Sequence, residues 1–258
     1  MPDRTATDAT LVIHLAGHLT VTAGERVATA RSFGGPLARR ALAVLALEQR
    51  LVTRDELADD LWGDRLPRTW PTGLRGVLAK VRRALRAIGV EDRLVNVDGG
   101  IELAGPSRVD LLDAEADLAV AEQHRRTGDP LTAAQLTSAA AAVLGRPLLP
   151  GDPSEWAESQ RRRFAEARIT ALVLESHAAR EAGVRTLALR TARHAIRLDP
   201  LREAAHVALA RAHLDGGDRT AALLALRRGE EVMRAELGVP LSPATAAFRT
   251  EVLRSLER

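Results

Sequence analysis

One stretch of the sequence has the composition of a surface that binds phosphate. Residues 65–90 carry seven basic side chains and no Asp or Glu, although the whole chain is nearly balanced, with 37 Lys and Arg against 34 Asp and Glu. The planar guanidinium fork of arginine pairs with phosphate oxygens and with guanine, whereas a carboxylate repels a phosphate backbone. The stretch therefore predicts contact with a nucleic acid.

Helical spacing divides this stretch into two faces. Pro71 suits the first turn of a helix, and at about 100° per residue positions 72–88 separate into an apolar and a basic face. The apolar face holds Leu74, Val77, Leu78, Val81, Leu85 and Ile88. The opposite face holds Thr72, Arg75, Gly76, Ala79, Arg83 and Arg86, with Lys80 and Arg82 at its flanks. A solvated arginine-rich helix without a ligand is the alternative, but such helices usually include acidic partners.

The residues before this helix predict short strands and two further helices. Short strands with turns are indicated over 11–17 and 19–27, and a helix over 38–49. Thr53 followed by Glu56 forms a capping-box pattern, which begins the second helix at Thr53.

A hairpin is predicted after the basic helix, with strands over 94–97 and 101–103 around the turn Asp98-Gly99-Gly100. Three helices followed by a hairpin are the order of a winged helix-turn-helix. In that motif the last helix enters the major groove of double-stranded DNA, and the hairpin reaches the flanking DNA.

From Val109 onward the strand patterns disappear and the sequence predicts helices only. Gly, Pro and Asp clusters divide this part into segments. The predicted helices cover residues 110–127, 131–144, 154–181, 185–198, 202–215, 218–236 and 242–257.

Two of these segments repeat with a period of 34 residues. Shifting Ala188, Ala192 and Ala195 by 34 gives Ala222, Leu226 and Gly229. This period, with small residues at helix crossings, is typical of tetratricopeptide repeats, which form protein-binding surfaces. An alanine-rich bundle that matches by chance is the alternative.

The order of these segments resembles the SARP (Streptomyces antibiotic regulatory protein) type of transcriptional regulator. The resemblance covers about residues 11–255. It is carried by RSFGGPLARRALAVLALEQRLVTRDELADDLWGD (31–64), LRGVLAKVRRAL (74–85), LGRPLLPGDPSEWAESQR (144–161), LDPLREAAHVALARAHLDGGDRTAAL (198–223) and AELGVPLSP (235–243).

The resemblance implies a mainly α fold in two domains. An OmpR-like winged helix of α+β structure is expected over 11–106, after a flexible tail over 1–10, and a tetratricopeptide-like bacterial transcriptional activation domain over 107–258. The implied function is an activator that binds direct repeats at promoters, as a possible homodimer on DNA, and contacts RNA polymerase and its sigma factor.

The residues expected to contact DNA come from the basic helix and its surroundings. Thr72 and Arg75 would lie nearest the bases, because the first turns of a recognition helix enter the groove. The expected phosphate contacts are Lys80, Arg82, Arg83 and Arg86, with Arg68, Arg39 and Arg40 as weaker candidates.

Departures from the family pattern keep a second hypothesis open. Val77 and Ala79 stand where the family usually has polar groups, with Gly76 among them, and Asp98 at the hairpin tip is unfavourable beside phosphate. The alternative function is a helical-repeat adaptor between proteins, whose winged helix has lost sequence-specific DNA binding.

Several other classes of protein are excluded. The chain has no Cys, its seven His form no metal-binding pattern, and it has neither a phosphate-binding loop nor a nucleophile with its base. We therefore expect no metal, no cofactor and no enzymatic activity, and the short, two-domain form of the family. The polar N-terminus and the absence of a long apolar run predict a cytoplasmic protein without membrane contact.

Overall fold

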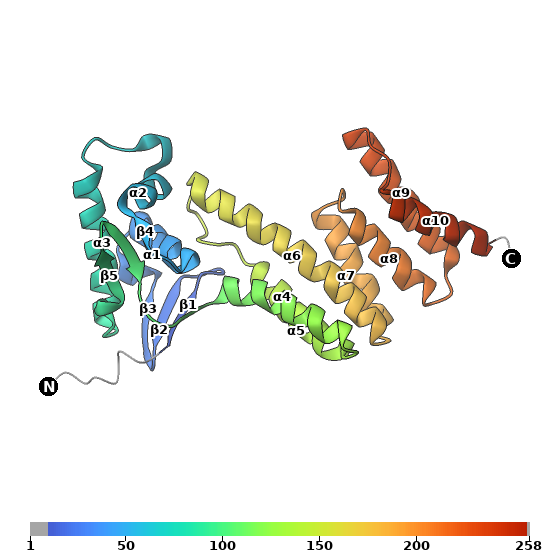
Figure 1. Ribbon diagram of the computed structural model, residues 1–258, viewed down its shortest axis with the longest axis horizontal. Coiled ribbons are helices and arrows are strands. Elements are labelled where there is room, and N and C mark those ends of the chain that lie inside the picture. Colours follow the sequence, from blue (N-terminus) through green and yellow to red (C-terminus); the bar gives the residue numbers. More distant parts are fainter. Residues whose placement is uncertain (1–9, 257–258) are drawn as a thin grey trace. The chain divides into compact units, whose positions relative to one another are not determined.

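The structure is a computed structural model that describes residues 10–256 and forms two compact units (Figure 1). The first unit combines the chain up to Ala114 with Val143–Ala165, and the second combines Glu115–Ala142 with the chain from Glu166. The predicted tail lies outside the described residues except for Thr10. The predicted domain boundary at residues 106 and 107 stays a prediction, whereas the first compact unit also includes 143–165.

A four-stranded sheet opens the first unit. Its strands are β1 (Leu11–His14), β2 (Thr20–Ala23), β3 (Arg26–Thr29) and β7 (Ser107–Val109), in the order β3-β2-β1-β7. β2 is antiparallel to β1 and β3, whereas β7 is parallel to β1. The strands and turns predicted over 19–27 correspond to β2 and β3, and Gly24, at φ 57°, turns the chain between them.

Three helices follow, each preceded or followed by short 3-10 turns. They are α1 (Pro36–Glu48), α2 (Arg54–Trp62) and α3 (Trp70–Ala87), with the turns η2 (Ala30–Phe33), η3 (Gly63–Arg65) and η4 (Glu91–Arg93). The capping box is confirmed, since Thr53 Oγ1 accepts the Glu56 N–H at 3.2 Å and Glu56 Oε2 accepts the Thr53 N–H at 2.8 Å. Leucines at 42, 45, 57, 61, 74 and 85 are fully buried and fix the three helices around one core.

The hairpin consists of β5 (Leu94–Val97) and β6 (Gly100–Leu103). Asp98 and Gly99 form a two-residue turn with φ 41° and 84°, the positive values of the turn type that matches strand twist. Gly100 pairs with Val97 and belongs to the strand, not to the turn. A two-residue strand, β4 (Val52–Thr53), pairs with β6 and was too short to be predicted from spacing.

The remaining elements are helices, as predicted. They are α4 (Asp110–Arg126), α5 (Pro130–Leu144), α6 (Glu155–Glu181), α7 (Arg185–Leu198), α8 (Glu203–Leu214), α9 (Arg219–Leu237) and α10 (Pro243–Leu256).

The 34-residue repeat is visible as packing between helix pairs. Ala188, Ala192 and Ala195 on α7 are fully buried, as are Ala222 and Leu226 on α9. The shifted position Gly229 lets α9 approach α8, because a Cβ atom there would lie 2.9 Å from the Cγ of His206. The predicted fold class, a winged helix plus a helical repeat unit, is confirmed.

Candidate nucleic-acid interface

Helix α3 is anchored by one face and exposes the other. All six predicted apolar residues, from Leu74 to Ile88, are between 0 and 7% exposed. The opposite positions are exposed, namely Thr72, Arg75, Gly76, Ala79, Lys80, Arg83 and Arg86. Because the buried face fixes the rotation of the helix about its axis, the basic side chains all extend from its exposed face.

The N-terminal turns of α3 bring together the two residues predicted nearest the bases. Thr72 and Arg75 are both exposed, and Arg75 Nη2 donates to Thr72 Oγ1 at 3.1 Å. The pair holds the guanidinium along the exposed face, one turn from the start of the helix. Arg75 keeps further donors that are available to a ligand.

Arg82 has a second role that its position in the sequence does not reveal. Its side chain is half-buried, and Nη2 donates to the carbonyl oxygen of Leu94 at 3.1 Å, in β5. Arg82 therefore ties α3 to the hairpin, which Figure 1 shows with β5 beside α3. This hydrogen bond positions the hairpin beside α3.

Two further predicted phosphate contacts, Arg86 and Arg68, differ in their surroundings. Arg86 pairs with Glu91 at 3.3 Å, and its side chain is 66% exposed, so the pair costs little to break. Arg68 is exposed in the connection between α2 and α3. Both remain compatible with phosphate contact.

Arg40 belongs to the core, contrary to its place among the predicted phosphate contacts. It is 7% exposed, its Nε and Nη2 donate to the carboxylate of Asp152 at 3.0 and 2.5 Å, and Nη1 donates to the carbonyl of Leu61. Because its nitrogens already donate to Asp152 and Leu61, this guanidinium is not available to contact DNA. Arg39, the next candidate, is half-buried and lines a cavity instead of the basic face.

Arg93 has a structural role that was not predicted from the sequence. It is 3% exposed and donates to the carbonyls of Ala104 and Pro106, where the chain leaves the hairpin. Burial lowers the pKa of its guanidinium, and the carbonyls replace the lost water. A single Arg next to a short strand gives no sequence signal that separates an anchor from a DNA contact.

Two kinds of site are absent from the part of the chain that the structure describes, a metal cluster and a membrane-spanning helix. Among residues 10–256 there is no group of three or more His, Asp or Glu side chains arranged to hold a metal. In the same part of the chain, no helix combines the length and the apolar character needed to cross a bilayer.

A winged helix with an exposed basic third helix, joined to paired helices, is the architecture of a bacterial transcription regulator. Residues 109–253 match the bacterial transcriptional activator domain, and the chain belongs to this family. The family regulates transcription, and the predicted resemblance to SARP-type regulators is confirmed.

Three known proteins illustrate the relationship. Regulatory protein AfsR of Streptomyces coelicolor is 31% identical over 240 residues, which are 90% of this chain and 23% of AfsR. AfsR of Streptomyces griseus is 31% identical over 88% of this chain and 23% of its own length. The chain thus spans about a quarter of these curated relatives. The structure of Mycobacterium tuberculosis EmbR in complex with a low affinity phosphopeptide matches with a TM-score of 0.84 at 22% identity. This match covers 96% of this chain and 66% of the EmbR chain, and it shows that the two chains share a fold.

Proposed function

We propose that this protein is a DNA-binding transcriptional activator that inserts α3 into the major groove. One observation carries the proposal: the exposed face of α3 bears Arg75, Lys80, Arg83 and Arg86 without a carboxylate, while its other face is locked into the core. In helix-turn-helix proteins, the N-terminal end of the recognition helix enters the groove, and Thr72 and Arg75 lie at that end of α3.

The test of base reading is the substitution Arg75→Ala. A bidentate contact from this side chain to guanine contributes roughly 1–3 kcal/mol, so specific affinity is expected to fall while non-specific affinity changes little. Fluorescence anisotropy measures the two affinities, one with a duplex that the protein recognises and the other with a duplex of scrambled sequence. Arg108, an exposed arginine on β7, provides the matched control Arg108→Ala. An unchanged ratio of specific to non-specific binding in Arg75→Ala refutes the base contact.

Phosphate contact predicts a different signature. Arg83→Ala is expected to weaken binding to every sequence alike and to reduce the slope of log K against log salt by about one. Arg86 and Lys80 are proposed to act in the same way, with Arg68 in the preceding connection. We leave Arg40 out of the interface, because it is buried against Asp152.

We further propose that two copies bind side by side on direct repeats and recruit RNA polymerase through contact with its sigma factor. Family membership supports this proposal. Footprinting on a bound promoter is expected to protect two repeats, and transcription by purified polymerase holoenzyme is expected to rise when the protein is added. Protection of one repeat alone argues against paired binding.

A protein-protein adaptor is the second candidate, because Gly76 and Ala79 leave part of the exposed face of α3 without polar groups. Buried small residues also pack the helical repeat into the kind of unit that binds proteins. Charge reversal at the exposed Arg83 separates the two functions. Arg83→Glu abolishes DNA binding under the first and leaves partner binding unchanged under the second.

A further inference from the structure

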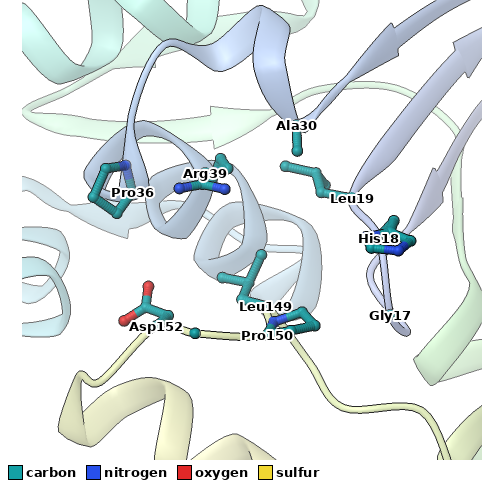
Figure 2. Close-up of a pocket in the computed structure, with 10 residues that line it drawn as sticks. Gly17, His18, Leu19, Ala30, Pro36, Arg39, Leu149, Pro150 and Asp152 are labelled. Atoms are coloured by element: carbon teal, nitrogen blue, oxygen red, sulfur yellow. The ribbon is translucent and has the colours of Figure 1, made fainter.

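A small cavity in the first unit lies at the N-terminal end of α1. Its volume is about 160 Å³. The walls come from the β1–β2 turn, from η2, from α1 and from the segment before α6. They include Leu19, Ala30, Pro36, Arg39, Leu149 and Pro150, which Figure 2 shows around the Arg39 side chain.

Two ionisable side chains besides Asp152 line the cavity, His18 and Arg39, and the permanent positive charge is that of Arg39. Asp152 also lines it, but its carboxylate is occupied by Nε and Nη2 of Arg40 at 3.0 and 2.5 Å. Arg39 donates only a long bond from Nε to the Gly35 carbonyl at 3.4 Å, and its two terminal nitrogens make no hydrogen bond or ion pair with the described residues. An anion is therefore the ligand that this cavity fits.

The backbone beside Arg39 adds to the positive character. Gly35 is the N-cap of α1 and supplies no side-chain cap, so the first N–H groups of the helix have no partner from a cap. A second, more open hollow of about 300 Å³ shares Ala30 and Arg39 and adds Arg31 and Gly34 to its lining.

Size and lining restrict the rest of the ligand. An apolar cavity of about 150 Å³ accommodates benzene, so a ligand here has about six heavy atoms. A nucleotide or a sugar phosphate does not fit that space. The wall beyond Arg39 includes the apolar Leu19, Leu149 and Pro150, and the exposed His18 also lines the cavity. Leu149 is held at φ 40°, a conformation that side-chain-bearing residues rarely adopt and that gathers at ligand clamps.

We propose that this cavity binds a small monocarboxylate, with the carboxylate on Arg39 at the start of α1 and the short alkyl group against Leu19 and Leu149. The inference does not depend on DNA binding, so the two are tested separately.

Titration of ¹⁵N-labelled protein with sodium butyrate, which has six heavy atoms, tests the proposal. We expect saturable amide shifts confined to Leu19, Gly35, Leu149 and Gly151. Acetate is expected to bind more weakly because it leaves the apolar wall empty, and hexanoate because it exceeds the cavity. Butanol and sodium chloride control for the alkyl group and the ionic strength. No saturable shift with any of the three carboxylates overturns the proposal.

Two variants assign the binding to this cavity. Arg39→Gln is expected to weaken butyrate binding at least tenfold, whereas Arg83→Gln on α3 leaves it unchanged. Gly35 has an extended backbone, φ 164° and ψ 167°, with open space beside it, so Asp fits there. Gly35→Asp places a carboxylate on the start of α1 and is expected to abolish the shifts while raising the melting temperature. Saturable binding that survives in both variants overturns the proposal.

Discussion

At the scale of single residues, the structure separates arginines that look alike in the sequence. Arg39 and Arg40 are neighbours, yet Arg40 is buried against Asp152 while Arg39 faces a cavity. Arg82 and Arg83 are also neighbours, and Arg83 is exposed whereas Arg82 is half-buried. In a chain with 37 Lys and Arg, the role of each cation follows from its partners, not from its charge.

The buried pair predicts a large stability effect. Arg40→Ala leaves the carboxylate of Asp152, which is 7% exposed, without its guanidinium partner. The expected loss is about 3–5 kcal/mol of unfolding free energy, measured by urea denaturation. The double variant Arg40→Met with Asp152→Leu removes both charges and is expected to recover most of that loss. A loss below about 1 kcal/mol in Arg40→Ala contradicts the role assigned to the pair.

Asp60 predicts a pH-dependent effect in α2. Burial, together with the negative charges of Glu48, Asp59 and Glu56, raises its pKa to about 6. A raised carboxyl pKa means that the folded state binds the proton more tightly. Ionised Asp60 therefore costs stability above pH 6, and the cost disappears as pH falls from about 6 towards 4.

The variant Asp60→Asn removes that cost. It is expected to stabilise the protein by roughly 1 kcal/mol at pH 7.5, a value reduced for the partial exposure of the side chain, and to have little effect near pH 4. Asp64→Asn, an exposed carboxylate in the following turn, is the control and is expected to change little. Thermal unfolding at both pH values checks the sign, and an equal gain at both contradicts the assignment.

At the scale of elements, the same substitution has opposite effects in two helices. Gly229 in α9 faces the side chain of His206, where an added Cβ would lie 2.9 Å from Cγ, while nothing lies within 4 Å of a Cβ at Gly76 in α3. Gly76→Ala is expected to stabilise by up to about 1 kcal/mol through helix propensity. Gly229→Ala is expected to destabilise, because the α8–α9 contact must open. Equal gains in both variants contradict the close approach at Gly229.

The elements also show what sequence patterns predict well. The helices of the second half and the faces of α3 followed from apolar spacing, because each buried face repeats over several turns. Strands β4 and β7, of two and three residues, were missed because their pairing depends on distant partners such as Ile101 and Leu11. Spacing carries no information about such long-range pairing.

At the scale of the whole molecule, the first unit is more than the winged helix that the sequence predicts. Arg161 on α6 donates to the carbonyls of Leu148 and Asp152 at 2.9 and 2.7 Å, and Asp152 in turn holds Arg40 of α1. The segment 143–165 thereby becomes part of the first compact unit, although it lies within the region matched by the family. The exposed face of α3 could be predicted from the sequence, but the Arg40–Asp152 pair could not, because it joins residues 112 positions apart.

The most direct test of DNA reading by α3 is recovery of genomic DNA fragments from the source organism by the purified protein at low and moderate salt. Wild-type protein is expected to enrich promoter fragments with direct repeats, and total recovery is expected to fall steeply with salt. Arg75→Ala is expected to lose the enrichment while still retaining DNA at low salt. Uniform recovery of all fragments by the wild type, or none even at low salt, contradicts the account.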